Sequence, residues 1–510
     1  MTMKRRDFLK LGASAGAAAI VMGSGIPFLG MKNAFAAGSQ TLEVTITDCM
    51  KQMVTHNEIN DARCYFWIYK MSLVDSVGNR TDIPAECPGP TIYAINGDSI
   101  TIKITNSLDQ PHSFFIPGPL PGDPAIFDSG KINPGQTVGP FTFTVKNSGA
   151  HLYYDNLNEP VNRQMGLHGA LVVRPAAALS GHNFTPYDVT SNNYKNGTGP
   201  AAHVQKMYDM FGTQFWPGLK WEQSDPNTNT PGFRQYVWLY HMPAPNLHAE
   251  VGNLPAGQEM DPKVFMNKIA RDTFSPTRNN GLPQYFTVNG QSGFFSHFDP
   301  AITPISRVGE PVVIHILNAG VQGVSHHMHC NHFFITSING AINPNPIWVD
   351  IYGVRPMDRI DYTFPFMRPP DNANVRGIGR PDTPLKTAGG GFCWPPQQEM
   401  QTFFPALGTK AKAQDGITDV EMGQRLSPLC YPAHDHLESS QTAQGGNYNC
   451  GLITGAYILG DRNAQSQGLG NFMDFPMDQD FRQMFRDIRG LAVNQVNGTR
   501  EAAGPRTVAG

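Results

Sequence analysis

The sequence predicts an all-β protein built from tandem Greek-key β-sandwich domains. Charged residues make up only 15% of the 510 positions, whereas Gly and Pro occur 52 and 42 times, which suits a chain with many turns. Apolar and polar residues alternate with period two in several runs, as in residues 99–105. Since these runs are bounded by Gly, Pro and Asn, they are typical of strands and turns.

The first 36 residues are expected to be a twin-arginine export signal. Residues 4–10 carry the paired arginines, a weakly hydrophobic Ala- and Gly-rich run follows, and residues 34–36 form a small-x-small cleavage site. The alternative is an N-terminal membrane anchor. No later stretch approaches the ~20 apolar residues of a membrane span. Removing five basic residues and one acidic residue takes the net charge from −3 to −7, which argues against nucleic-acid binding.

A first sandwich is predicted over residues 37–178. Residues 42–46 and 99–105 alternate as strands, 94–98 form a turn between strands, and 140–145 form a further strand. The length suits one Greek-key domain.

The rest of the chain is predicted as a linker, a second domain and a tail. Asn, Thr, Gly, Pro and Ser crowd residues 179–230, which indicates a linker or insertion. Strand patterns return at 235–240, so a second domain is expected over 231–460, with a Pro- and Gly-rich loop insertion at 340–430. The tail, 461–510, carries a short amphipathic helix at 478–486.

Seven cysteines follow the signal segment, an odd number. An oxidising compartment permits disulfides, but at least one thiol must stay free or bond to another chain. Cys330 is expected to be free, because it lies inside a histidine cluster. The pairing of the others stays open.

Histidines are concentrated in two short windows. Six of the 16 histidines lie within residues 326–332 and 434–436, and His112 lies upstream in a Pro-His-Ser-Phe segment. Two histidines two apart on a strand point to the same face, so His434 and His436 can reach one metal or one each of a close pair. Imidazole suits copper, zinc, iron and nickel.

With these motifs, the chain resembles the multicopper oxidases, which are built from cupredoxin domains. The resemblance covers roughly residues 40–460 and includes the segments 166–173, 286–290 and 441–448. It implies tandem cupredoxin-like sandwiches or barrels with long inserted loops. The order and spacing of the motifs match the family well, but the ligands match badly.

The two early motifs keep one ligand. The resemblance gives His112 the type 2 copper position, whereas Phe114 stands at a type 3 position and cannot ligate. Residues 153–156, Tyr-Tyr-Asp-Asn, stand where two type 3 histidines belong. His151 and His168 lie nearby but out of register, and are expected to be ordinary strand and turn histidines.

The two late motifs keep more of the family's histidine ligands. His326 matches the type 1 histidine and His329 the type 2 histidine, while Asn331 stands at a type 3 position for which His332 is a substitute. The type 3 positions of the last motif are held by His434 and His436. Asp435 replaces the type 1 cysteine, and Ser440 replaces the second type 1 histidine.

The resemblance therefore implies a reduced metal site. The metal ligands expected are His112, His329, His434 and His436, pointing into one cavity between domains, with His326 and His332 as additional candidates. One mononuclear copper is expected rather than a full four-copper set, and zinc suits the ligands on chemistry alone. Asp155 or Asp435 would orient an imidazole, and Tyr154 would act beside the metal. Without the cysteine thiolate, no type 1 copper is expected.

Two functions follow. The first is an exported, multicopper-oxidase-like copper protein, periplasmic or extracellular, with oxidoreductase activity on an unknown small molecule or electron partner. The second is a copper-free scaffold of the cell envelope in which the histidines bond to each other and to water. Both type 2 histidines persist while most other ligands are lost, which favours the first. A two-domain chain would form a homotrimer, as two-domain members of the family do.

Overall fold

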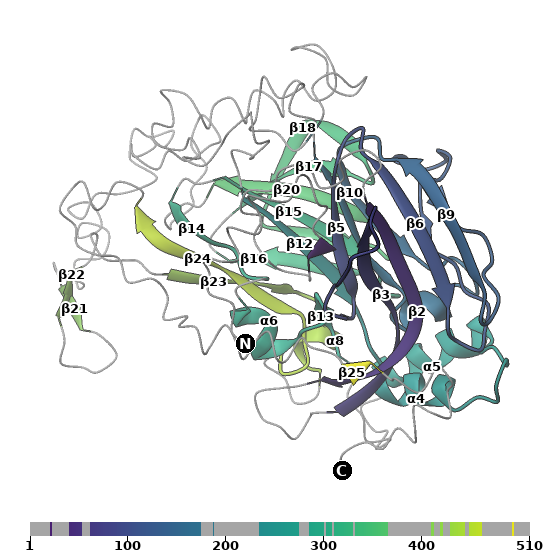
Figure 1. Cartoon of the computed structure of the whole chain (residues 1–510). Helices are drawn as coiled ribbons and strands as arrows, with labels where there is room; N and C mark the ends of the chain where they lie inside the picture. Colours follow the sequence, from purple (N-terminus) through teal and green to yellow (C-terminus); the bar gives the residue numbers. More distant parts are fainter. Residues whose placement is uncertain are drawn as a thin grey trace, which may run out of the picture.

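The protein is described here by a computed structural model (Figure 1). The structure describes residues 21–22, 40–53, 62–174, 187, 234–274, 285–299, 302–308, 311–329, 332–365, 410–412, 419–421, 429–443, 448–461 and 492–493. These residues form two β-sandwiches and a few helices, which confirms the predicted all-β, cupredoxin-like fold class.

The first sandwich consists of two sheets. The sheet that faces the rest of the molecule runs β1 (Val21–Met22), β5 (Gly89–Ile95), β11 (His168–Arg174), β10 (Gly149–Tyr154), β7 (Phe115–Ile116) and β8 (Phe127–Asp128). The outer sheet runs β4 (Arg80–Asp82), β3 (Ala62–Asp75), β2 (Gln40–Met53), β6 (Ser99–Asn106) and β9 (Thr137–Thr144), with β25 (Ala492–Val493) paired to β2.

Period-two patterning builds this sandwich. Buried and half-buried residues alternate strictly along β6, so its isoleucines enter the core while Ser99, Thr101 and Thr105 face outward. Thr101 and Thr105 bond across to Thr142 and Thr137 on β9. The core is apolar and rich in aromatic rings, including Trp67, Tyr69, Phe114 and Tyr153.

The second sandwich repeats this two-sheet plan. One sheet runs β13 (Thr287–Val288), β12 (Arg234–His241), β15 (Pro311–Asn318), β20 (Arg359–Pro365), β17 (Phe333–Ile338) and β18 (Ala341–Val349). The other runs β14 (Ile305–Val308), β24 (Ile453–Asp461), β23 (Leu429–Asp435), β16 (Val324–Met328) and β19 (Ile351–Val354). Trp238, Ile314, Met328 and Ala433 meet in its own core. A separate hairpin joins β21 (Lys410–Lys412) to β22 (Asp419–Glu421).

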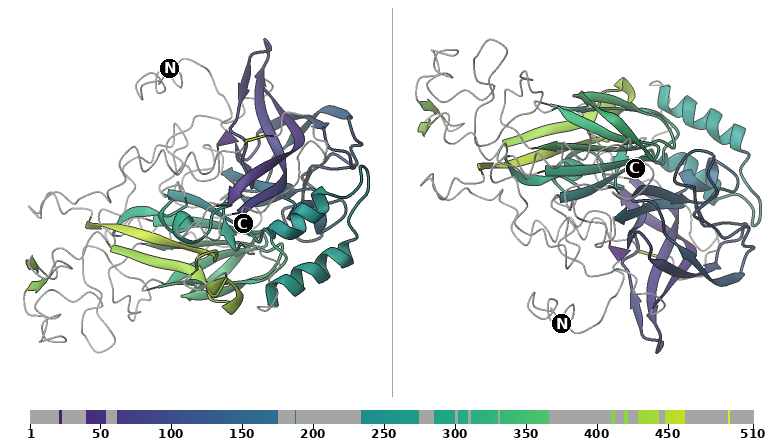
Figure 2. Two further views of the ribbon diagram at one scale, coloured as in Figure 1. Left: turned by 90° about the horizontal axis from the view of Figure 1, so that it is seen from below. Right: turned by 90° about the horizontal axis from the view of Figure 1, so that it is seen from above.

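The described helices are α2 (Val161–Gln164), α4 (Pro245–Gly252), α5 (Pro262–Phe274), α6 (Gly293–Phe298) and α8 (Glu438–Gln441). Helix α4 begins at Pro245, which suits a first helical position because its missing N–H would have no partner there. Although α4 and α5 follow β12 of the second sandwich, their apolar residues Leu247, Val251 and Phe265 enter the core of the first. Both views in Figure 2 show these two helices beside the early strands.

The junction between the sandwiches has an apolar centre. Strands β5 and β11 are buried along their whole length, as expected of strands covered on both faces. Their outward residues Tyr93 and Val172 pack against Val237, Leu239 and Leu317 of the second sandwich.

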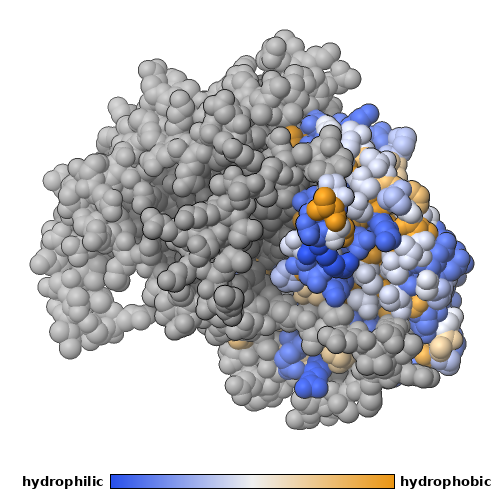
Figure 3. All heavy atoms as spheres, in the orientation of Figure 1, coloured by the Kyte–Doolittle hydropathy of each residue, from blue (hydrophilic) through white to orange (hydrophobic). Residues whose placement is uncertain are grey.

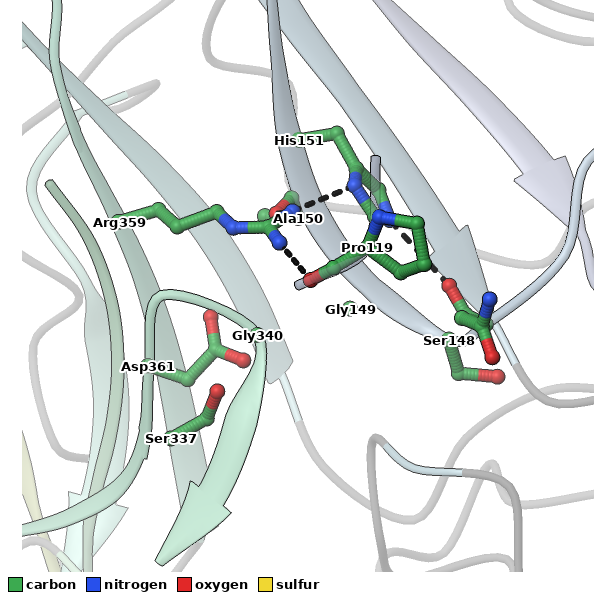
Figure 4. Close-up of a pocket in the computed structure, with 10 residues that line it drawn as sticks. Pro119, Ser148, Gly149, Ala150, His151, Ser337, Gly340, Arg359 and Asp361 are labelled. Carbon is green, nitrogen blue, oxygen red and sulfur yellow. Dashed lines mark hydrogen bonds between the residues drawn. The ribbon is translucent and has the colours of Figure 1, made fainter. Parts of the chain in front are cut away.

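A polar pocket lies at the edge of this junction (Figure 4). Arg359 of β20 crosses it and donates hydrogen bonds to the carbonyl oxygens of Ala150 and Pro119, and its guanidinium also contacts His151 Nδ1. Gly340 has a φ of +84° and lies so close to the Pro119 carbonyl oxygen that a Cβ would overlap it. Arg359 and this close contact tie the two sandwiches together.

Some predicted segments differ from the structure. The first part of the predicted insertion at 340–430 consists of strands β18, β19 and β20, because their apolar residues complete the second sandwich. Helices α4 and α5 were not predicted. Within the predicted linker at 179–230 only Tyr187 is described, and its hydroxyl bonds to Thr336 and Asp361. The predicted helix at 478–486 lies outside the described residues.

None of the helices in the described part of the chain is long and apolar enough to span a membrane. On the face drawn in Figure 3, the described residues intersperse hydrophilic and hydrophobic positions.

Candidate metal centre

Two neighbouring strands of the second sandwich bring the late histidines together. Strands β16 and β23 are antiparallel, with His327 opposite His434 and His326 opposite Asp435. Directly opposed residues share a face of the sheet, and faces alternate along each strand. His327 and His434 therefore point away from the core, as do His329 and His436, while His326 and Asp435 point into it.

The outward imidazoles are in contact. His329 Nε2 lies 2.8 Å from His434 Nε2, and the ring of His327 lies 4.9 Å from that of His329 and 5.3 Å from that of His434. One nitrogen from each of these three rings lies within 4.8 Å of the others. The exposed ring of His436 adjoins the group, 5.5 Å from His327 and 5.7 Å from His434.

Hydrogen bonds fix which nitrogen two of these rings present. His327 Nδ1 lies 2.9 Å from the Asp350 carbonyl oxygen, and His434 Nδ1 lies 3.1 Å from that of Asp435. Because a carbonyl oxygen only accepts, both Nδ1 atoms carry the proton and both Nε2 atoms keep a lone pair. The Tyr448 hydroxyl donates to the same Asp435 oxygen, at 2.9 Å, and its oxygen contacts His434 Nδ1.

The electrostatics keep the rings of His329 and His434 neutral near pH 7. Burial, reinforced by the neighbouring imidazoles, lowers the pKa of His434 to about 4. Burial and the proximity of His327 and His436 also lower the pKa of His329. Neutral imidazole is the form that binds metals, so these two rings are ready to ligate without first losing a proton to solvent.

The donor set fits a borderline-soft divalent ion. Three imidazole nitrogens at ~2.0 Å from one ion lie about 3.3 Å apart, which the observed spacing approaches with small ring rotations. Nitrogen ligands suit copper and zinc, and affinity rises toward copper among divalent ions. Backbone carbonyls orient two rings, as partners of metal-ligating histidines commonly do.

His112, a predicted ligand, lies in the first sandwich instead. It is fully buried against the ring of Trp67, at 5.0 Å, and its Nδ1 lies 2.7 Å from Asp155 Oδ2. Asp155 also accepts hydrogen bonds from Ser113 Oγ and Asn162 Nδ2. His112 Nε2 is buried and has no hydrogen-bond partner in the part of the chain that the structure describes. The structure thus supports the predicted orienting role of Asp155, but does not bring His112 into the group on β16 and β23.

In the two early motifs, aromatic side chains that pack in or against the first sandwich stand where the family has metal ligands. Phe114 stacks on Tyr153 at 4.9 Å inside the first core. The Tyr153 hydroxyl donates to the Pro90 carbonyl oxygen. Tyr154, predicted to act beside the metal, is half-buried against the edge of Phe115 at 5.4 Å, and burial raises its pKa. It pairs with His168 of β11, away from the histidines of β16 and β23.

Two further candidates have other partners. His326 is buried between the hydroxyls of Tyr240, at 3.1 Å, and Tyr362, at 3.0 Å, and burial lowers its pKa to about 3. His332 packs against Trp348 with ring centres 4.8 Å apart. Neither belongs to the group of nitrogens within 4.8 Å of one another that the described residues contain.

Asp435, at the cysteine position, is a structural residue of the strand end. Its Oδ1 accepts from the backbone N–H groups of Ser325 and Leu437, and burial raises its pKa to about 6. Ser440 Oγ accepts from the Leu452 N–H. The side chains at the two replaced type 1 positions, Asp435 and Ser440, are therefore engaged with the backbone.

His327 is the site residue that the sequence prediction missed. The motif pattern assigns it no ligand position, because it directly follows His326. Strand periodicity is the signal that could have found it, since 327 and 329 share a face, as do 434 and 436. Cys330 and Asn331 lie outside the described residues. Cys49, Cys64 and Cys87 are buried free thiols, and Cys450 is buried as well.

Comparison with known proteins supports the resemblance in the first sandwich. Residues 72–178 match the family described as multicopper oxidase. An L-ascorbate oxidase from Cucurbita pepo var. melopepo is 36% identical over 100 residues, which are 18% of this chain and 18% of the oxidase. Residues 72–178 are thus similar to a multicopper oxidase domain.

Other known proteins are similar to this chain over short or long stretches. Copper resistance protein A from Escherichia coli is 31% identical over 91 residues, or 17% of this chain and 14% of that protein. The chain thus spans about a fifth or less of the length of the curated multicopper oxidase relatives it matches. A blue copper oxidase from Nitrosomonas europaea aligns in structure over 90% of this chain and 98% of its own, at 15% identity and a TM-score of 0.44.

Proposed function

We propose that this chain is an exported copper-binding protein with one mononuclear, histidine-ligated centre and oxidoreductase activity on a small molecule. The observation that carries the proposal is the convergence of His327, His329 and His434, whose ring nitrogens lie within 4.8 Å of one another. The similarity of residues 72–178 to a multicopper oxidase domain supports copper as the metal. A carboxylate in place of the type 1 cysteine argues for one centre rather than the full set.

Each residue of the centre has a defined task. His327 and His434 present their Nε2 atoms to the metal. Their Nδ1 atoms donate to the Asp350 and Asp435 carbonyl oxygens, which orients both rings. His329 supplies the third nitrogen and must release its contact with His434 to do so. His436, which is exposed beside them, would supply a fourth. Bound copper would contribute one-electron chemistry.

Tyr448 holds His434 in place. Its hydroxyl donates to the Asp435 carbonyl oxygen while its oxygen lies against His434 Nδ1. Tyr448 has a φ of +55°, which is uncommon for a residue with a side chain. Such conformations cost free energy and persist where the surroundings hold them. Tyr448 therefore keeps Nε2 of His434 turned toward the other imidazoles.

We expect copper-loaded protein to show no intense visible band from copper–thiolate charge transfer. The reason is that Asp435 stands where a blue centre needs a soft thiolate, and its carboxylate is already bonded to the backbone. An absorption spectrum of the mature protein with one equivalent of copper checks this. An intense blue colour would contradict it and point to Cys330 or Cys450 as a ligand.

Export by the twin-arginine route is a further part of the proposal. Replacement of both arginines, Arg5→Lys and Arg6→Lys, should leave the protein in the cytoplasm, because that route depends on the arginine pair. Fractionation of cells followed by immunoblotting measures the distribution. Periplasmic accumulation of the double variant at the wild-type level would count against the route.

The second candidate function is a copper-free scaffold of the cell envelope. The His329–His434 contact favours it, because two imidazoles can satisfy each other without a metal. Metal analysis of purified mature protein distinguishes the two. A stoichiometric metal supports the copper protein, and none after copper loading supports the scaffold. If the chain functions as a two-domain member, a homotrimer is the assembly to test by light scattering.

A further inference from the structure

Three buried imidazoles meet beside the apolar junction between the two sandwiches. His168 lies on β11 of the first sandwich, His241 ends β12 of the second, and His248 lies on α4. The rings of His168 and His241 are 4.5 Å apart, and those of His241 and His248 are 6.3 Å apart. All three residues are at most 1% exposed. They come from both sides of the junction and have no part in the proposed metal centre.

Each of these rings donates one N–H to a backbone carbonyl oxygen, and burial keeps the ring in its neutral form. His168 Nδ1 donates to Arg163, His241 Nε2 to Gln164 and His248 Nδ1 to Tyr65, at 2.8 Å in each case. A single N–H satisfies each contact, and the other nitrogen of His168 is buried with no hydrogen-bond partner among the described residues. A second proton on that nitrogen would therefore be buried without an acceptor, which is costly.

Among the described residues, a guanidinium faces two of the three rings. The Arg163 guanidinium, paired with Glu159 at 3.1 Å, reaches across to the Ala319 and Gly320 carbonyl oxygens and faces His168 and His241. On the β3 side the neighbours are the Cys64 thiol, 3.5 Å from His248, and the ring of Phe66; the Lys51 amine lies beyond that thiol. Within the described part of the chain, no hydrogen bond joins a carboxylate to any of the three rings.

A fourth neutral imidazole lies at the pocket of Figure 4. His151 is 2% exposed and contacts the Arg359 guanidinium, which crosses from the second sandwich. The other titratable groups that face it are His315 and its partner Asp361, whose Oδ1 is 2.6 Å from His315 Nδ1. Protonation of His151 would place two cations in contact.

We propose that the junction between the two sandwiches is an acid-sensitive joint, in which protonation of His151, His168, His241 and His248 uncouples the sandwiches. Four imidazoles and two guanidiniums line the joint, and each added proton brings like charges together. Each sandwich keeps its own apolar core when the joint opens.

The pH window follows from the direction of the shifts. Burial lowers the pKa of His248 to about 4, of His168 and His151 to about 3, and of His241 well below its usual value. Histidine in an unfolded or opened chain titrates near ~6.5. The opened form therefore binds more protons, so the closed form is fully favoured above ~6.5 and loses stability as the pH falls toward 4.

The experiment is small-angle X-ray scattering of the metal-free full chain across pH 7 to 4, with circular dichroism on the same samples. We expect the radius of gyration to rise on acidification while the β-sheet signal is retained. The triple variant His168→Asn, His241→Gln, His248→Asn should move the midpoint at least one pH unit lower. Each replacement keeps an amide N–H near the position of the original donor and removes the titrating group.

Two measurements keep the proposal testable if the triple variant does not fold. The single variant His248→Asn should shift the midpoint in the same direction, and the control His182→Gln should not. In the wild type, amide exchange corrected for intrinsic rate should increase first at residues 163–168 and 241–248. An unchanged radius of gyration down to pH 4, or equal midpoints for the wild type and a folded triple variant, would overturn the proposal.

Discussion

The variant His329→Ala should lose stoichiometric copper binding and the copper-dependent rise in melting temperature. His329 Nε2 is the nitrogen in closest contact with His434, so its removal leaves two ligands of the three that converge. A ligand that binds the folded form stabilises it by about 2.7 kcal/mol at one hundred times its dissociation constant. For a domain of about 150–250 residues, this stabilisation raises the melting temperature by roughly 5–10 °C. Calorimetry with and without copper, together with metal analysis, measures both losses.

Matched variants separate the centre from its neighbours. His434→Ala and His327→Ala should reproduce the loss, whereas His182→Ala should not. His112→Ala tests whether the first sandwich contributes a ligand, as the family resemblance implies. If His329→Ala still binds one copper with unchanged affinity, the centre is elsewhere in the chain. Copper uptake abolished by His112→Ala alone would mean that the first sandwich supplies an essential ligand.

The variant Asp155→Ala should strongly destabilise the metal-free protein. The carboxylate is fully buried and accepts hydrogen bonds from His112, Ser113 and Asn162, all of them buried. Its removal leaves three buried donors without that acceptor, at about 1–3 kcal/mol each, so the free energy of unfolding should fall by roughly 4 kcal/mol. Chemical denaturation without metal measures the effect.

Asp155→Asn is the matched control, because it keeps the shape and one accepting oxygen. It should lose less than half as much stability as Asp155→Ala. Copper stoichiometry should be unchanged in both variants if the centre lies on β16 and β23. Equal stability of Asp155→Ala and the wild type would show that this network is not a structural support of the first sandwich.

The sequence was sufficient for the fold class because period-two patterning is local. Alternation along residues 42–46 and 99–105 predicts strands that the structure contains as β2 and β6. The helices α4 and α5 were not predicted, because their apolar residues pack in the core of the first sandwich although they follow a strand of the second. That pairing depends on tertiary packing rather than on a local pattern.

The candidate site was predictable only in part, for a geometric reason. Motif spacing placed His329, His434 and His436 together, and the structure brings them together. Motif spacing could not place His327 in the metal centre, because its position there depends on the register between β16 and β23. Motif spacing also could not show that His112 is enclosed. The loop that joins α4 to α5 forms hydrogen bonds with Asp109, Gln110 and Asn158, and these residues flank the His112–Asp155 pair.

The doubly covered sheet of the first sandwich limits how the protein can be divided. In the intact chain, Tyr93, Leu152 and Val172 are buried against the second sandwich. A chain cut after residue 178 would present these residues to water as one apolar patch, and such patches promote self-association. It would also lack α4 and α5, whose Leu247, Val251 and Phe265 complete its core. Solubility would therefore be lost before the histidines of either sandwich could be studied separately.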